Sequence, residues 1–135
     1  MTLCDAAPLV AIFIKRDANH ARCLAALPCL PRPLVTTWPC VTEAMYLLHK
    51  YGGHPAQDAL WQMLEDGKLQ IHLNDAAERL QMRALMQRYA DTPMDLADAS
   101  LVVAAETLEQ SRIFTLDSDF RVYRLPTGAA FEIVP

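Results

Sequence analysis

The chain has 135 residues, which predicts one domain, residues 1–135, with its own core and leaves no room for two ordinary domains. Hydrophobic residues make up 53% of it, which excludes an intrinsically disordered chain. The formal net charge of −4 gives no general attraction for nucleic acid, yet nine arginines against three lysines suit bidentate contacts with phosphate, so charge alone excludes no partner.

The first half of the chain alternates strand and helix patterns. The element boundaries are marked by prolines 28, 31 and 33, which stiffen one connection, and by Gly52-Gly53, which ends a helix. The expected elements are a strand at Thr2–Cys4, a helix from Pro8 to Ile14, a helix from His20 to Leu27 with Asn19 as its N-cap, a strand at Leu34–Trp38 and a helix from Pro39 to Tyr51.

The second half continues the alternation. The expected elements are helices at 55–64, from Asn74 or Asp75 to Tyr89 and at Asp95–Gln110, and strands at Leu69–Leu73, Arg112–Leu116 and Phe131–Val134. On the helix that ends at Tyr89, we expect Leu80, Leu85 and Met86 on the inner face. Strands that alternate with helices predict an α/β sandwich with a mainly parallel central sheet, whose sites lie at the carboxyl ends of the strands.

No segment is typical of a membrane or secreted protein. The longest apolar run, Leu9 to Ile14, is too short to span a bilayer, and it follows Asp5 instead of a basic region. We therefore expect a cytoplasmic protein.

The cysteines and histidines indicate neither disulfides nor zinc. Cys4, Cys23, Cys29 and Cys40 form no CxxC pair and stand in apolar surroundings, which favours buried thiols. The four histidines, at 20, 49, 54 and 72, show no paired ligand spacing.

The acidic residues at the ends of these elements each have an ordinary structural explanation. Asp5 follows a strand and can cap a helix, and Asp98 three residues after Asp95 resembles a capping box. Asp117 suits an Asx turn, Asp119 suits a cap for the turn at residue 120, and Glu43 complements a helix dipole.

These separate explanations do not account for the convergence of the acids at one edge. Asp98 precedes Leu101–Ala105, an almost entirely apolar stretch that should be buried, so it faces the rim of the sheet, where Asp5 and Asp117 also lie. Carboxylates in such surroundings are unfavourable unless a cation lies between them. The pattern predicts a divalent metal site.

Four segments carry a resemblance to a known family. The chain resembles PIN-domain nucleases of the VapC toxin type along nearly its whole length. The resemblance rests on Asp5-Ala6-Ala7-Pro8-Leu9-Val10-Ala11, on Thr36-Thr37-Trp38-Pro39-Cys40-Val41-Thr42-Glu43-Ala44, on Met94-Asp95-Leu96-Ala97-Asp98-Ala99-Ser100-Leu101-Val102 and on Thr115-Leu116-Asp117-Ser118-Asp119-Phe120. It implies a PIN-like three-layer sandwich and a Mg²⁺- or Mn²⁺-dependent endoribonuclease, usually a homodimeric toxin that a cognate antitoxin holds inactive.

The same resemblance assigns roles to particular residues. It places Asp5, Glu43, Asp98 and Asp117 as the catalytic acidic quartet, with Asp5, Asp98 and Asp117 as metal ligands. Asp95 and Asp119 are expected to assist, and Thr115 keeps the hydroxyl that the family has two residues before the fourth acid. Ala6 stands where the family commonly has a hydroxyl residue.

The residue inventory suits metal-assisted hydrolysis. Carboxylate oxygens select Mg²⁺ or Mn²⁺, and one or two such ions make a nucleophilic side chain unnecessary, which fits a chain with three serines and no GxSxG turn. Four arginines are candidates for RNA contacts, and they are Arg16, Arg22, Arg121 and Arg124.

Other functions remain open at this point. The four glycines form no phosphate-binding loop, and a receiver domain needs a late lysine, whereas the last one here is Lys68. A catalytically weak RNA-binding or partner-docking module on the same fold is an alternative, and so is a stand-alone RNA-processing nuclease.

Overall fold

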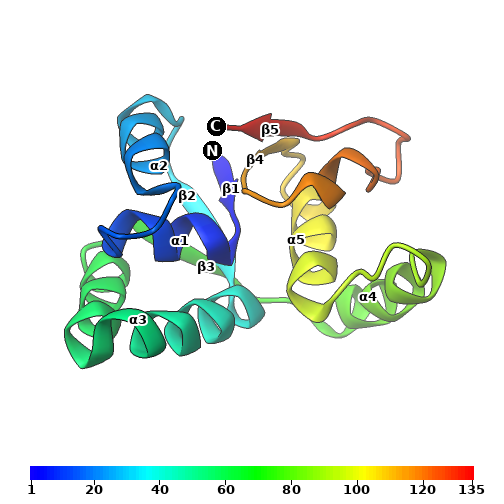
Figure 1. Ribbon diagram of the computed structural model, residues 1–135. Coiled ribbons are helices and arrows are strands. Elements are labelled where there is room, and N and C mark those ends of the chain that lie inside the picture. Colours follow the sequence, from blue (N-terminus) through cyan, green and yellow to red (C-terminus); the bar gives the residue numbers. More distant parts are fainter.

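A five-stranded sheet forms the centre of the computed structural model, which describes all residues from Met1 to Pro135. Its strands are β1 (Thr2–Cys4), β2 (Leu34–Thr37), β3 (Leu69–His72), β4 (Arg112–Phe114) and β5 (Glu132–Val134), in the order β3-β2-β1-β4-β5. Every neighbouring pair is parallel. The carboxyl ends of all five strands therefore meet at one edge, with β1 in the middle (Figure 1).

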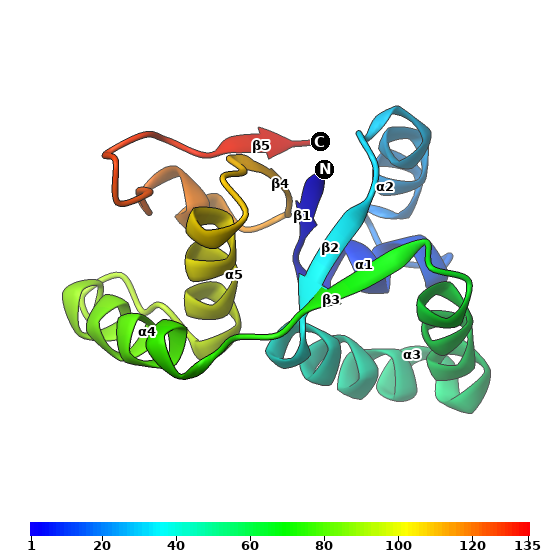
Figure 2. The same cartoon turned by 180° about the vertical axis from the view of Figure 1, so that it is seen from behind.

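Helices cover both faces of this sheet. On one side lie α1 (Ala6–Phe13), α2 (His20–Ala26) and α3 (Trp38–Glu65), and on the other lie α4 (Ala76–Arg88) and α5 (Leu96–Thr107), as both views show (Figures 1 and 2). α1 packs against α2 and α3, and α4 packs against α5. This arrangement confirms the predicted three-layer α/β sandwich with a parallel sheet. None of the helices is both long and apolar enough to cross a membrane.

The core is one continuous cluster of 33 buried hydrophobic residues. α5 is buried on all its sides, because every residue from Ala97 to Ala105 is buried. Because α5 leads into β4, which is parallel to the other strands, its first turn lies at the carboxyl edge of the sheet and carries Asp98 there.

Several element ends differ from the predicted ones for local reasons. α1 begins at Ala6, two residues before Pro8, because the Asp5 side chain accepts a hydrogen bond from the Ala6 amide and caps the helix there. β2 ends at Thr37, and Trp38 already belongs to α3. A short 3₁₀ helix, η1 (Leu27–Cys29), includes Pro28.

The predicted break at Gly52-Gly53 is present as a kink within α3. Gly53 has φ 68° and ψ −164°, which is outside the helical region and favours glycine. At Gly52 a Cβ would lie 2.7 Å from the Ala56 Cβ and 2.8 Å from the Ile14 Cδ1. The absence of a side chain therefore lets the end of α1 approach the kink.

Three details correct the sequence-based expectations. Leu80 is 72% exposed and lies on the outer face of α4, because Met82 takes the buried position and Leu85 and Met86 are only partly buried. Cys29 is exposed, whereas the other three cysteines are buried, and all four are free thiols. The turn expected at residue 120 is a 3₁₀ helix, η2 (Ser118–Arg121), and its N-cap is Asp117 instead of Asp119.

Candidate metal centre

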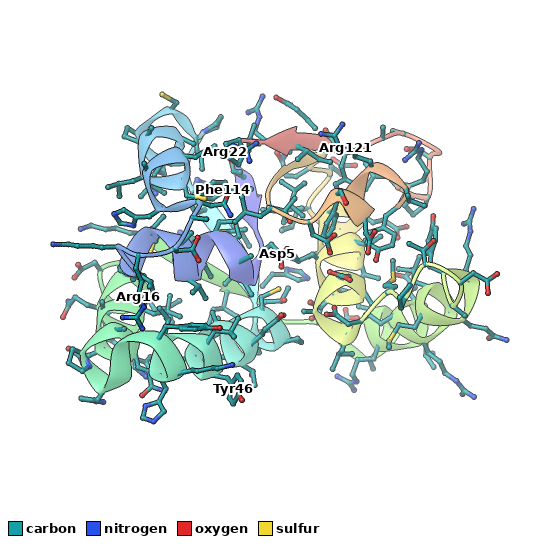
Figure 3. The ribbon with its side chains drawn as sticks, viewed as in Figure 1. Asp5, Arg16, Arg22, Tyr46, Phe114 and Arg121 are labelled. Atoms are coloured by element: carbon teal, nitrogen blue, oxygen red, sulfur yellow. The ribbon has the colours of Figure 1, made fainter.

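Asp5 stands at the junction of β1 and α1. Its backbone amide donates to the Phe114 carbonyl, 3.0 Å away, which extends the pairing of β1 and β4 by one residue. Its Oδ1 accepts from the Ala6 amide at 2.7 Å and its Oδ2 from the Thr115 hydroxyl at 2.7 Å. Asp5 is 6% exposed and lies between α1 and the other layer (Figure 3). Each carboxylate oxygen keeps a second lone pair for another ligand.

Asp95 and Asp98 form the capping box that their spacing predicts. The Asp98 amide donates to Asp95 Oδ1 at 2.8 Å, and the Asp95 amide donates to Asp98 Oδ2 at 3.2 Å. Asp98 Oδ1 accepts no hydrogen bond, and no buried polar side-chain atom lacks a partner, so this oxygen is open to solvent. The capping role and a ligand role are therefore compatible.

Tyr123 is a part of this centre that the sequence does not reveal. Its side chain is fully buried, and its hydroxyl donates to Asp98 Oδ2 at 3.2 Å. Edge-on contacts with Phe120 and Tyr89, each at 5.2 Å between ring centroids, hold the ring in place. Burial and the Asp98 carboxylate both raise the pKa of Tyr123, so the hydroxyl stays protonated and remains a donor. No motif or helical spacing connects residues 123 and 98.

Asp117 and Asp119 follow β4 in a hydrogen-bonded turn. The Thr115 hydroxyl, which donates to Asp5, also accepts from the Asp117 amide at 3.0 Å. Asp117 Oδ1 accepts from the Asp119 amide at 2.8 Å, as expected for an Asx turn. One buried hydroxyl thus ties together the strand ends that carry Asp5 and Asp117.

Glu43 approaches the same edge from α3. It is exposed and lines, with Asp95 and Tyr46, a surface hollow of about 670 Å³. Beneath the centre, the Thr37 and Ser100 hydroxyls are 2.6 Å apart and join the end of β2 to the first turns of α5. This buried contact fixes the relative position of α3 and α5, the two helices that present Glu43 and Asp98.

The carboxylates of this centre raise one another's pKa values. Burial, followed by the charges of Asp95, Asp5 and Asp117, raises the pKa of Asp98 to about 7. Burial is also the largest cause of the raised pKa of Asp5 and of Glu43, with neighbouring carboxylates adding to it. No cation acts on any of the three, and all ion pairs of the chain lie elsewhere. The negative charge at this edge is uncompensated.

A divalent ion fits this set of residues by donor type and by charge. The side chains as they stand form no ready-made group of three or more ligands. Mg²⁺ in proteins is commonly held by one or two carboxylates and keeps several water molecules, so a pair of these carboxylates suffices. The open oxygens at the strand ends are hard donors suited to Mg²⁺ or Mn²⁺.

The four arginines singled out from the sequence are not gathered around the acids. Arg16 lies beyond the far end of α1, donates to the Tyr51 carbonyl and faces the Tyr51 ring, against α3 (Figure 3). Arg22 donates to the Pro135 carbonyl at 3.0 Å, which places it at the carboxyl end of β5. Arg121 ends η2, and Arg124 donates to the Arg121 and Tyr123 carbonyls. Of the four, Arg22, Arg121 and Arg124 lie on segments at the carboxyl edge of the sheet, and Arg16 does not.

Known proteins share this fold and this arrangement of elements. No protein-family model matches the sequence. The chain is 29% identical over 132 residues to ribonuclease VapC26 of Mycobacterium tuberculosis, which covers 97% of this chain and 98% of that protein. The crystal structure of VapC20 of Mycobacterium tuberculosis, a toxin that cleaves the sarcin–ricin loop, matches with a TM-score of 0.85 over 100% of both chains at 16% identity. A toxin–antitoxin complex from Klebsiella pneumoniae matches with a TM-score of 0.69 at 21% identity, over 89% of this chain and 90% of that one.

The parallel sheet and its helical layers place the chain in the α/β class, with the same fold as VapC20. Within that class, the curated VapC sequence is similar to this chain along almost its full length. The chain is therefore similar in sequence to a VapC ribonuclease along nearly its whole length, and it has the fold of VapC20.

Proposed function

We propose that this protein is a divalent-metal-dependent endoribonuclease and the toxin of a type II toxin–antitoxin pair. The single observation that carries the proposal is the gathering of uncompensated carboxylates at the carboxyl edge of the sheet, where burial and mutual repulsion raise the pKa of Asp98 to about 7. Such a cluster is unfavourable by itself and becomes favourable when it holds a cation. The curated relative is named as a ribonuclease, and the structural relatives include toxins.

In this proposal the residues have distinct roles. Asp5, Asp98 and Asp117 hold Mg²⁺ or Mn²⁺, and Glu43 completes the catalytic quartet. Asp95 orients Asp98 through the capping box, Thr115 orients Asp5 by its 2.7 Å hydrogen bond, and Asp119 assists Asp117. A bound ion would neutralise the scissile phosphate and activate water for attack on it. The Asp95 amide and the Tyr123 hydroxyl donate to Asp98 Oδ2 and keep this side chain in position.

A toxin of this kind needs partners. The structural relatives include a toxin–antitoxin complex and the VapBC2 complex of Rickettsia felis bound to promoter DNA. We propose that a cognate antitoxin binds this protein, that it forms homodimers, that it acts in the cytoplasm and that its substrate is RNA.

The proposal predicts cleavage of RNA by the purified protein in the presence of Mg²⁺ or Mn²⁺. Chelation with EDTA should abolish cleavage, and excess Mg²⁺ should restore it. Product analysis on end-labelled RNA would show internal cuts. Binding of RNA without any cleavage at saturating metal would instead support the non-catalytic docking module.

A growth experiment tests the toxin role separately. Expression of the chain should arrest growth, and co-expression of the neighbouring antitoxin gene should relieve the arrest. Cleavage in vitro without growth arrest would move the assignment to a stand-alone RNA-processing nuclease.

A further inference from the structure

A second hollow adjoins the one that Glu43 and Asp95 line. The acidic hollow, of about 670 Å³, and its neighbour, of about 620 Å³, share the side chains of Trp38, Pro39 and Leu96. The first is lined by Glu43 and Asp95, and the second contains no acid. The two hollows therefore form one groove, which has an acidic end and an end that no acidic residue lines.

The other end of the groove is cationic. Arg79 and Arg83 lie four residues apart on α4, so they occupy the same face of that helix on successive turns. Both are exposed, and neither forms an ion pair with a carboxylate. Arg79 donates to the Asn74 carbonyl at 3.3 Å, which directs it along the end of β3. Two guanidinium groups without anionic partners thus line the same hollow.

The wall between the two ends is aromatic. Trp38 is the first residue of α3, follows the carboxyl end of β2 directly and is 44% exposed. The Trp61 ring supports it at 6.4 Å between centroids, with a 58° angle between the planes. Leu73 and Leu96, 68% and 53% exposed, line the same hollow as Trp38. An exposed indole next to apolar side chains offers a surface on which a planar group can stack.

A buried hydrogen-bond network around Glu78 lies next to this hollow. Glu78, on the same helix as the arginines, is buried and accepts hydrogen bonds from Asn74 and Thr107, with His72 Nε2 2.9 Å from its carboxylate. This network joins the end of β3 to α4 and α5. It holds α4, which bears Arg79 and Arg83, to the end of β3 and to α5.

These features together match one chemical class of ligand. We infer that the hollow between Trp38 and the Arg79/Arg83 pair is a nucleotide subsite of the RNA substrate, in which one base stacks on Trp38 and the adjoining phosphates contact the two arginines. A volume of about 620 Å³ lies within the usual range for small-ligand pockets. Stacking on an aromatic side chain with cationic contacts to phosphate is the usual mode of binding for single-stranded nucleic acid.

The acidic end explains why such an anchor is useful. A polyanionic strand in this groove passes Glu43 and Asp95, neither of which forms an ion pair with a cation of the chain. A strand that crosses the metal centre therefore needs cationic and stacking contacts in the same groove. This inference rests on the proposed function, since it names where the substrate of that site is held.

Tryptophan fluorescence tests the subsite directly, because Trp38 and Trp61 are the two tryptophans of the chain. In a Trp61→Phe variant, titration with a short single-stranded RNA in EDTA should quench the fluorescence of Trp38 saturably. In the reciprocal Trp38→Phe variant, the same titration should leave the fluorescence of Trp61 almost unchanged. Equal quenching in both variants, or none in the first, would overturn the subsite.

Anisotropy of labelled RNA gives the matched measurement of affinity. Trp38→Ala should weaken binding roughly tenfold. The double variant Arg79→Gln with Arg83→Gln should weaken it and reduce the slope of log K against log salt by about 1.4, which is about 0.7 for each phosphate that an arginine no longer neutralises. Arg88→Gln is the control, since Arg88 lies further along α4 and lines a different hollow. Circular dichroism should show that every variant is folded.

The outcomes separate this inference from the proposed function. If the wild type cleaves RNA and the subsite variants bind and cleave like Arg88→Gln, the subsite is wrong and the nuclease assignment stands. If no cleavage occurs but Trp38 is quenched and the arginine variants bind weakly, the subsite stands and the nuclease assignment is wrong. If an acidic peptide quenches Trp38 and RNA does not, the hollow is a protein docking site and the inference fails.

Discussion

Replacement of Asp98 by asparagine is expected to lower metal-dependent RNA cleavage by about 100-fold or more while leaving the fold intact. Asparagine keeps an oxygen that can accept from the Asp95 amide and the Tyr123 hydroxyl, so the capping box and the buried contact survive. It removes the negative charge that the proposed metal site needs. Several kcal/mol of transition-state stabilisation depend on a bound ion, and each 1.4 kcal/mol corresponds to a factor of about ten in rate.

Matched variants make this expectation specific. Asp5→Asn should reduce cleavage to a similar extent, because it removes the charge at the end of β1. The asparagine oxygen can still accept from the Ala6 amide, and its NH2 group can donate to the Thr115 hydroxyl. Asp58→Asn removes the same charge from an exposed position on α3 outside the centre and should cleave like the wild type. Cleavage rates at saturating Mg²⁺ measure the effect. Full activity of Asp98→Asn would remove Asp98 from the site.

The metal-free protein is expected to lose stability as the pH rises from about 4 to above 7. In the folded chain the pKa of Asp98 is about 7, well above its ordinary value of 3.8. Between these values the folded state keeps a proton that the unfolded state has released. The stabilising contribution of the protonated Asp98 is therefore fully present below about 3.8 and is lost as the pH passes through about 7. Asp5 and Glu43, whose pKa values are also raised, act in the same direction.

Thermal unfolding of wild type and Asp98→Asn in EDTA isolates this contribution from the other titrating groups. At pH 8 the variant should melt higher than the wild type, by roughly 5 °C or more, and the difference should shrink at pH 5. Mg²⁺ at pH 8 should stabilise the wild type much more than the variant, because a ligand that binds only the folded state raises its stability. An equal melting temperature at pH 8, with no response to Mg²⁺, would show that Asp98 carries no unfavourable charge.

The fold was predictable where local signals and burial agree. β1 has the predicted bounds and is followed directly by Asp5, whereas β4 begins at the predicted Arg112 but ends two residues early, at Phe114. α5 was recognisable because its apolar residues run around the whole helix, which is possible only for a buried helix. Its N-terminal capping box was visible from the spacing of Asp95 and Asp98.

Features that depend on distant contacts were not predictable. Leu80 was expected inside α4, but the buried position on that helix belongs in part to Glu78, whose partners His72 and Thr107 are on other elements. Tyr123 reaches Asp98 only because η2 and the aromatic cluster fold back over α5. A single sequence does not show which polar side chain has its hydrogen bonds satisfied when buried.

The candidate site was predictable in part. The placement of Asp5 and Asp117 at carboxyl ends of parallel strands follows from the alternation of strands and helices. The cationic and aromatic end of the groove was not, because Trp38 on α3 and Arg79 and Arg83 on α4 come to line one hollow only in the folded chain, where α4 packs against α5. The arginines chosen from the sequence were close to motifs along the chain, which is a poor guide to proximity in space. The roles of the acidic residues themselves remain a prediction.

The most direct test of the account is a titration of the metal-free protein with Mn²⁺, with free Mn²⁺ followed by electron paramagnetic resonance. The account predicts saturable binding of one or two ions by the wild type at neutral pH, weaker binding as the pH falls below about 7, and loss of that binding in Asp98→Asn with retention in Asp58→Asn. Binding that is absent in the wild type, or equally strong in Asp98→Asn, would contradict a metal centre at the acidic edge of the sheet.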